Sequence, residues 1–120
     1  MMQNKKYDLP ERTEKFSICV RDFCRKVKWD IINKQYISQL IRSAGSVAAN
    51  YIEANENLGE GDLKYRIKVC RKESKESQLW LKHILSEDAG LEDERLKLIQ
   101  ESFELELIFG SILKKLEQRK

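Results

Sequence analysis

The sequence predicts an all-α protein, an antiparallel up-down-up-down four-helix bundle. Charged residues make up 36% of the 120 residues, with one proline and five glycines, too few turn residues for a β-sandwich or barrel. Apolar residues recur at spacings of three and four in four segments joined by short connections, which is typical of amphipathic helices in a bundle. The length suits one domain, residues 1–120, with a single core.

The first two helices are predicted at about residues 10–28 and 34–57. Pro10 suits the first turn of a helix, because its φ is fixed and its missing N–H is not needed there. Asn33 is placed to cap the second helix. The glycine-containing segment 57–61 is the clearest break in the chain and ends that helix.

The third and fourth helices are predicted at about residues 62–88 and 92–118. Asp62 is placed to cap the third helix, and Gly90 to supply a left-handed turn after it. Glu92 begins the fourth helix, where an acid interacts favourably with the macrodipole. The third helix also keeps a heptad whose two central members are serine. The heptad comprises Leu63, Ile67, Cys70, Ser74, Ser77, Leu81 and Ile84.

Polar residues of the second helix form a stripe beside its apolar face, because they recur at spacings of three and four. An antiparallel hairpin about the 57–61 turn places Ser46 opposite Glu73, Arg42 within reach of the third helix's glutamates, and Glu53 near Arg66. Buried polar groups left unpaired would each cost about 1–3 kcal/mol. We therefore predict a paired polar seam between these two helices. The seam comprises Arg42, Ser43, Ser46, Asn50, Glu53, Glu73 and Glu76.

The fourth helix carries two apolar stripes. The first comprises Leu98, Leu105, Phe109, Ile112 and Leu116. The second comprises Leu96, Ile99, Phe103, Leu107 and Leu113. A helix in an isolated bundle needs only one such stripe, so the excess either covers a loop or meets another subunit. We expect a homo-oligomer and assign the first stripe to the subunit interface.

Catalytic, cofactor and metal sites are not expected. His83 is the only histidine and position 80 is Trp, so the Glu-x-x-His pairs of di-iron bundles are missing. Ser43 and Ser46 have no activating base placed in the sequence. Three cysteines without a close pair indicate reduced thiols. The N-terminus lacks a signal peptide's apolar run, and no run approaches a membrane span, so we expect a cytoplasmic protein without a membrane partner.

Charge is unevenly distributed although the net charge is only +3. Residues 64–75 contain six Lys/Arg and one acid, whereas residues 86–106 contain eight acids and two bases. Four cations of the third helix share one face, and we call them the basic line: Lys64, Lys68, Arg71 and Lys75. Arg21 and Arg25 form a shorter line on the first helix. Such lines hold successive phosphates of a nucleic acid; the alternative is an ordinary solvated face.

Two sequence blocks carry a family resemblance. One runs from Arg42-Ser43 to Asn50-x-x-Glu53 and a glycine-containing turn, and the other spans residues 65–81 with its paired glutamates and Trp80-Leu81. They resemble bacterial four-helix bundle proteins related to those encoded in 23S ribosomal-RNA intervening sequences and to the accessory variability determinant of diversity-generating retroelements. The resemblance implies a homopentamer of antiparallel four-helix protomers. In the retroelement branch it also implies a basic surface that engages nucleic acid and a reverse transcriptase.

These observations together predict a non-enzymatic, oligomeric helical scaffold that associates with RNA or DNA, most plausibly structured RNA or an RNA–protein complex. The basic line is the predicted contact, with Arg21 and Arg25 as secondary contacts. The alternative is a structural protein–protein interaction module that does not bind nucleic acid. In that case the basic line meets an acidic partner, such as the 86–106 segment of a neighbouring subunit.

Overall fold

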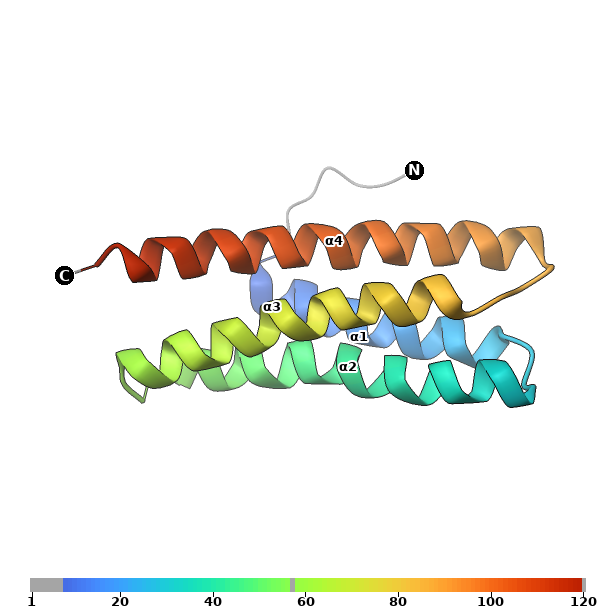
Figure 1. Ribbon diagram of the computed structural model, residues 1–120, viewed down its shortest axis with the longest axis horizontal. Coiled ribbons are helices and arrows are strands. Elements are labelled where there is room, and N and C mark those ends of the chain that lie inside the picture. Colours follow the sequence, from blue (N-terminus) through green and yellow to red (C-terminus); the bar gives the residue numbers. More distant parts are fainter. Residues whose placement is uncertain (1–7, 57, 120) are drawn as a thin grey trace.

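The computed structural model describes residues 8–56 and 58–119, which form four helices. In chain order these are α1 (Leu9–Lys26), α2 (Ile31–Glu56), α3 (Glu60–His83) and α4 (Ala89–Glu117). All four run along the long axis of a molecule measuring 51 × 32 × 20 Å (Figure 1). The predicted all-α class is confirmed.

Each helix packs against two others. α2 contacts α1 and α3, and α4 contacts α3 and α1. α1 and α3 are therefore diagonal to each other, as are α2 and α4, which run along the lower and upper edges of Figure 1. Because the connections are short, neighbouring helices alternate in direction, and the up-down-up-down bundle is confirmed.

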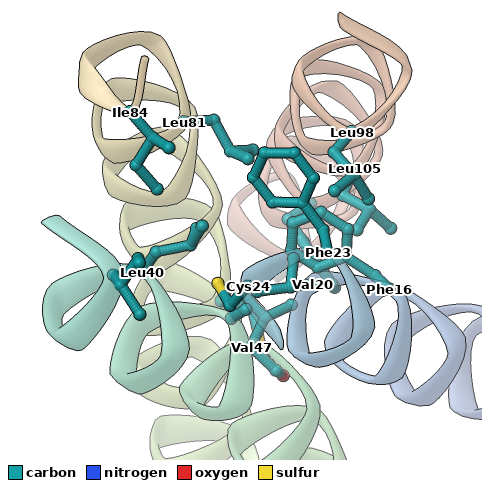
Figure 2. Packing of buried hydrophobic residues seen from close by; sticks show 14 of the residues in the cluster. Phe16, Val20, Phe23, Cys24, Leu40, Val47, Leu81, Ile84, Leu98 and Leu105 are labelled. Atoms are coloured by element: carbon teal, nitrogen blue, oxygen red, sulfur yellow. Dashed lines mark hydrogen bonds between the residues drawn. The ribbon is translucent and has the colours of Figure 1, made fainter. Parts of the chain in front are cut away.

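The core lies between the four apolar faces (Figure 2). Its largest fully buried side chains include Phe16, Phe23, Leu40, Leu81, Leu105 and Phe109. On α3 the predicted heptad faces this core, with Leu63 partly buried and the other six members buried. Ser74 is tolerated there because its hydroxyl donates to the Cys70 carbonyl at 2.8 Å.

The cap of α2 differs from the prediction. The carboxylate of Asp30 accepts hydrogen bonds from the backbone N–H groups of Ile32 and Asn33 at 3.1 and 2.7 Å. Asn33 lies inside the first turn instead, 3% exposed. Its amide donates to the carbonyls of Lys28 and Leu85 and accepts from the N–H of Leu85. Asn33 therefore ties the α1–α2 connection to the α3–α4 connection.

The end of α3 also differs, because the helix stops at His83 and not near residue 88. The backbone of Ile84 is extended while its side chain is fully buried. Asp88 then caps α4 by accepting from the N–H of Leu91 at 2.9 Å. Gly90 lies in the first turn of α4 and supplies no left-handed turn to α3.

The starts of the other helices lie within a few residues of those predicted. α1 begins one residue before Pro10, with Asp8 as its cap. α3 begins at Glu60 after Gly59, whose φ of +126° favours glycine, so Asp62 is not the cap. Asn57, the predicted last residue of the second helix, lies outside the described residues.

Candidate nucleic-acid interface

A pair of buried serines forms the centre of the contact between α2 and α3. The hydroxyl oxygens of Ser43 and Ser77 are 2.8 Å apart, and neither residue is exposed. The Ser43 hydroxyl also lies 3.2 Å from the carbonyl of Leu40, to which it can donate. Both hydroxyls have hydrogen-bond partners, as burial requires.

Arg42 reaches Glu73 and Glu76 of α3, as the antiparallel pairing predicts. Its guanidinium lies 3.5 Å from the Glu73 carboxylate and 3.3 Å from that of Glu76. Glu73 is only 4% exposed, and the Lys72 ammonium approaches it at 3.4 Å. Burying a carboxylate is costly unless nearby cations compensate it, and Arg42 and Lys72 supply these cations to Glu73 at the edge of the seam.

The part of the seam nearer the connection between α2 and α3 is paired differently from the prediction. The Asn50 amide donates to the carbonyl and hydroxyl oxygens of Ser46, both at 3.0 Å, and accepts from Arg66 at 2.9 Å. The carboxylate nearest to Arg66 is that of Asp62 at 3.5 Å. Glu53 is exposed and does not pair with Arg66. Ser46 bonds within its own helix and not to Glu73.

Replacing Arg42 with methionine is expected to lower the free energy of unfolding by about 1–2 kcal/mol, because Glu73 then loses a cation. Adding Glu73→Gln to the same chain should recover most of that loss, since no buried charge remains. Urea denaturation of the two single variants and the double variant measures the coupling. Equal losses in Arg42→Met and in the double variant would contradict a stabilising pair.

The basic line lies along the outer face of α3. Lys68, Arg71 and Lys75 are exposed, and no carboxylate of residues 8–56 or 58–119 lies within 4.0 Å of them. Lys64 is partly buried and 3.9 Å from Glu60. A surface depression of about 420 Å³ follows this face. It is lined by Lys68, Arg71, Lys72, Lys75 and Glu76.

The α3–α4 pairing adds a cation that the sequence analysis did not assign to this surface. A Cβ atom at Gly110 would lie 3.8 Å from Nε of Arg71, so Arg71 extends across to α4. Lys114 follows Gly110 by four residues, shares its face of α4 and is exposed. The spacing of residues within α4 does not predict this placement, because the face of α4 that meets Arg71 depends on how the two helices pack.

Arg21 and Arg25 lie on a separate surface. They belong to α1, which is diagonal to α3. Arg21 pairs with Asp22 at 3.0 Å and borders the groove between α1 and α2. Arg25 is exposed on the same helix. The two basic lines therefore do not form one continuous patch.

Most acids of the 86–106 segment are engaged within the protomer. Ion pairs join Arg12 to Glu101 and Glu104, Lys26 to Glu94, Arg95 to Glu92 and Lys97 to Asp93. Hydrogen bonds from Gln100 and then Arg12 hold the pKa of Glu104 below its usual value, and a hydrogen bond from Arg95 lowers that of Glu92. Four cations of the same chain thus pair with five of the eight acids in this segment.

The predicted subunit interface on the fourth helix is wrong. Leu98, Leu105, Phe109 and Leu116 are at most 8% exposed, and Ile112 packs partly buried against the same core. This stripe faces the bundle interior. Part of the second stripe faces outward and we call it the outer ridge: Leu96, Phe103 and Leu107, exposed by 57%, 41% and 54%. Of the other two members, Ile99 is partly buried and Leu113 is buried.

His83, Cys24 and Cys70 are further side chains that could carry chemistry, and each one packs against its own bundle. Nδ1 of His83 lies 2.8 Å from the Leu79 carbonyl, and its ring packs 4.9 Å from that of Tyr36. Burial raises the pKa of the Cys24 and Cys70 thiols to about 12. Within the described ranges, no three His, Cys, Asp or Glu side chains are grouped as metal ligands would be. No described helix has the length and apolarity needed to cross a membrane.

Comparison with protein-family models and with curated proteins gives no match. Among solved structures, the chain is similar to a protein of unknown function from the S23 ribosomal protein family of Bacteroides thetaiotaomicron. The two are 19% identical and superpose with a TM-score of 0.71, over 88% of this chain and 98% of the other. At this identity the likeness establishes a shared four-helix fold.

Proposed function

We propose that this protein is a non-enzymatic, oligomeric helical scaffold that associates with nucleic acid, namely structured RNA or an RNA–protein complex in the cytoplasm. The observation that carries the proposal is the state of the basic line. Lys68, Arg71 and Lys75 are exposed side by side on α3, with no carboxylate of the described chain in ion-pair range. Unpaired cations on one helical face attract a polyanion.

The spacing of these cations suits a phosphate backbone. Lys64 and Lys75 are eleven residues apart, about 16 Å along the helix, which is enough to follow several phosphates of one strand. Lys114 adds charge from the same face of α4 as Gly110, which Arg71 approaches. Contacts of this kind position a nucleic acid through its backbone and do not read its bases. We therefore expect recognition of shape and charge.

The alternative partner, an acidic segment of a neighbouring subunit, is less favoured. Five of the eight acids of the 86–106 segment are already paired with Arg12, Lys26, Arg95 and Lys97. Moving them to the basic line of another copy would exchange one set of ion pairs for another, with little net gain. A nucleic acid brings phosphates that have no such pairs to lose.

Self-association is supported by the outer ridge. Leu96, Phe103 and Leu107 are large apolar side chains exposed on one face of α4, and clustered exposed apolar groups mark interaction surfaces. The shared fold with a protein of the S23 ribosomal protein family is compatible with the resemblance described above. We also propose that the chain belongs to that wider family and that it assembles as a homopentamer.

The absence of catalysis is supported by how the polar groups are used. The hydroxyls of Ser43 and Ser77 bond to each other, and Glu73 and Glu76 are paired with Arg42. No base activates either serine in these contacts. These groups hold α2 against α3.

Binding of a labelled RNA hairpin, measured by fluorescence anisotropy against salt, tests the proposal. With about three phosphates neutralised per protomer, the logarithm of the affinity should fall by about 2–3 per tenfold rise in salt, a 20- to 40-fold loss between about 50 and 200 mM. Duplex DNA of the same length serves as the comparison. Failure to bind either nucleic acid at the lowest salt would overturn the proposed association.

A further inference from the structure

We propose that the outer ridge of one protomer packs into the groove between α1 and α2 of a second copy, so that copies join head to tail. This inference rests on the self-association proposed above and adds the two surfaces that make the contact. One surface is the outer ridge already defined. The other is a depression of about 250 Å³ lined by Ser17, Ile18, Val20, Arg21, Ile41 and Gly45.

The depression is shaped to receive a large apolar side chain. Ile18 and Ile41 are 40% and 47% exposed on its two sides. Gly45 lies one turn after Ile41 on α2 with no side chain, and a Cβ atom built there would meet no atom within 4 Å. The groove therefore has apolar walls and open space above Gly45. Neither exposed isoleucine is needed to complete the core, which is built from other residues.

The outer ridge has the complementary shape. Phe103 and Leu107 are four residues apart, so their side chains are neighbours on α4. They project as a pair of large groups, with Leu96 about two turns nearer the start of the helix. Large side chains of one helix that enter a hole lined by small residues are the usual way in which helices pack closely. Phe103 and Leu107 are the projecting groups, and the space above Gly45 is the hole.

The two surfaces face opposite sides of the protomer. α2 and α4 are diagonal in the bundle and lie at opposite edges of Figure 1. The depression opens on the α1 side of α2. The outer ridge lies on the α3 side of α4, because the adjacent Glu106 accepts a hydrogen bond from Gln78 at 3.1 Å. A contact between two different surfaces on opposite sides is heterologous, and each added copy leaves one surface free for the next.

The two surfaces also lie at the same height along the bundle. Ser43 of α2 meets Ser77 of α3, and the next residue, Gln78, meets Glu106 of α4. The depression is lined on α2 by Ile41 and Gly45, which flank Ser43 in the chain, and Leu107 follows Glu106 directly. Copies joined through these surfaces need no shift along their long axes. A heterologous contact without such a shift can close into a ring, whereas a shifted one grows into a helical filament.

Two substitutions test the contact from its two sides. Leu107→Glu places a charge on the outer ridge, and Gly45→Gln fills the depression. Leu79→Glu is the control, because Leu79 is 45% exposed on α3 and belongs to neither surface. In light scattering coupled to size exclusion, we expect an oligomer for the wild type and for Leu79→Glu, and monomers for the other two. Thermal melts establish folding, and Gly45→Gln should melt higher than Leu107→Glu, since both are monomers and glutamine favours a helix interior over glycine.

Mixing the two monomeric variants gives the decisive result. Leu107→Glu keeps an intact depression and Gly45→Gln keeps an intact outer ridge, so a mixture should form a complex of two chains and nothing larger. A mixture that stays monomeric would overturn the pairing. Variants that remain oligomeric would overturn this contact and leave self-association standing. A monomeric wild type would overturn both, and RNA binding by the monomers tests the nucleic-acid proposal separately.

Discussion

Reversing the charge of Lys68, Arg71 and Lys75 to glutamate is expected to weaken RNA binding on the order of 100-fold or more near 100 mM salt. These three cations are the exposed members of the basic line, with no carboxylate of the described residues in ion-pair range. Each phosphate contact removed should also flatten the salt dependence by about one unit of slope. The triple variant should therefore bind weakly and with little response to salt.

The matched control reverses Lys28, Lys34 and Lys115, which are also exposed. It changes the net charge by the same amount but leaves the basic line intact. Anisotropy titrations of both triple variants against the same RNA hairpin, over the same salt range, separate the two effects. Equal losses in the two variants would mean that net charge alone drives binding, which would contradict a localised interface on α3.

Replacing Phe109 with alanine is expected to lower the free energy of unfolding by about 3–5 kcal/mol. Phe109 is 0% exposed, and its ring lies 5.9 Å from that of Tyr51 in the core. Truncation removes buried apolar surface and leaves a cavity that the surrounding helices fill only in part. Urea denaturation followed by circular dichroism measures the loss.

Phe103→Ala is the control for the same chemical change on the same helix. Phe103 is 41% exposed, so its truncation should cost about 1 kcal/mol or less. Both variants should be made in the Leu107→Glu background, so that self-association does not contribute to the unfolding measured. A loss for Phe109→Ala no larger than that for Phe103→Ala would contradict the placement of Phe109 in the core.

The polar seam is the part of the candidate architecture that sequence reasoning described best. The spacing of Ser43 and Arg42 on one helix, with serines and glutamates on the next, depends only on helical periodicity and on an antiparallel turn. The contacts of Arg42 with Glu73 and Glu76 follow from that register. Glu53 was misplaced, because Asp62 and Asn50 lie closer to Arg66 in the folded hairpin.

The ends of the helices were less predictable, because more than one residue near a helix start can act as its N-cap. Asp30 and Asn33 are both good capping residues, and the sequence does not say which will be used. The fold decides the matter by burying Asn33 against the backbone of Leu85, which is 52 residues away in the chain. α3 likewise ends at His83 so that Ile84 can enter the core with an extended backbone.

The sequence by itself determined the four helices, their alternating directions and the residues that share each face, because helical periodicity is a local property. Tertiary structure alone decided which apolar stripe of α4 turns inward and that Arg71 extends across to Gly110 of α4. It also decided that Arg21 and Arg25 lie on another side from the basic line. Periodicity fixes how side chains are arranged around a helix axis, whereas the rotation of each helix about its axis is set by packing against its neighbours.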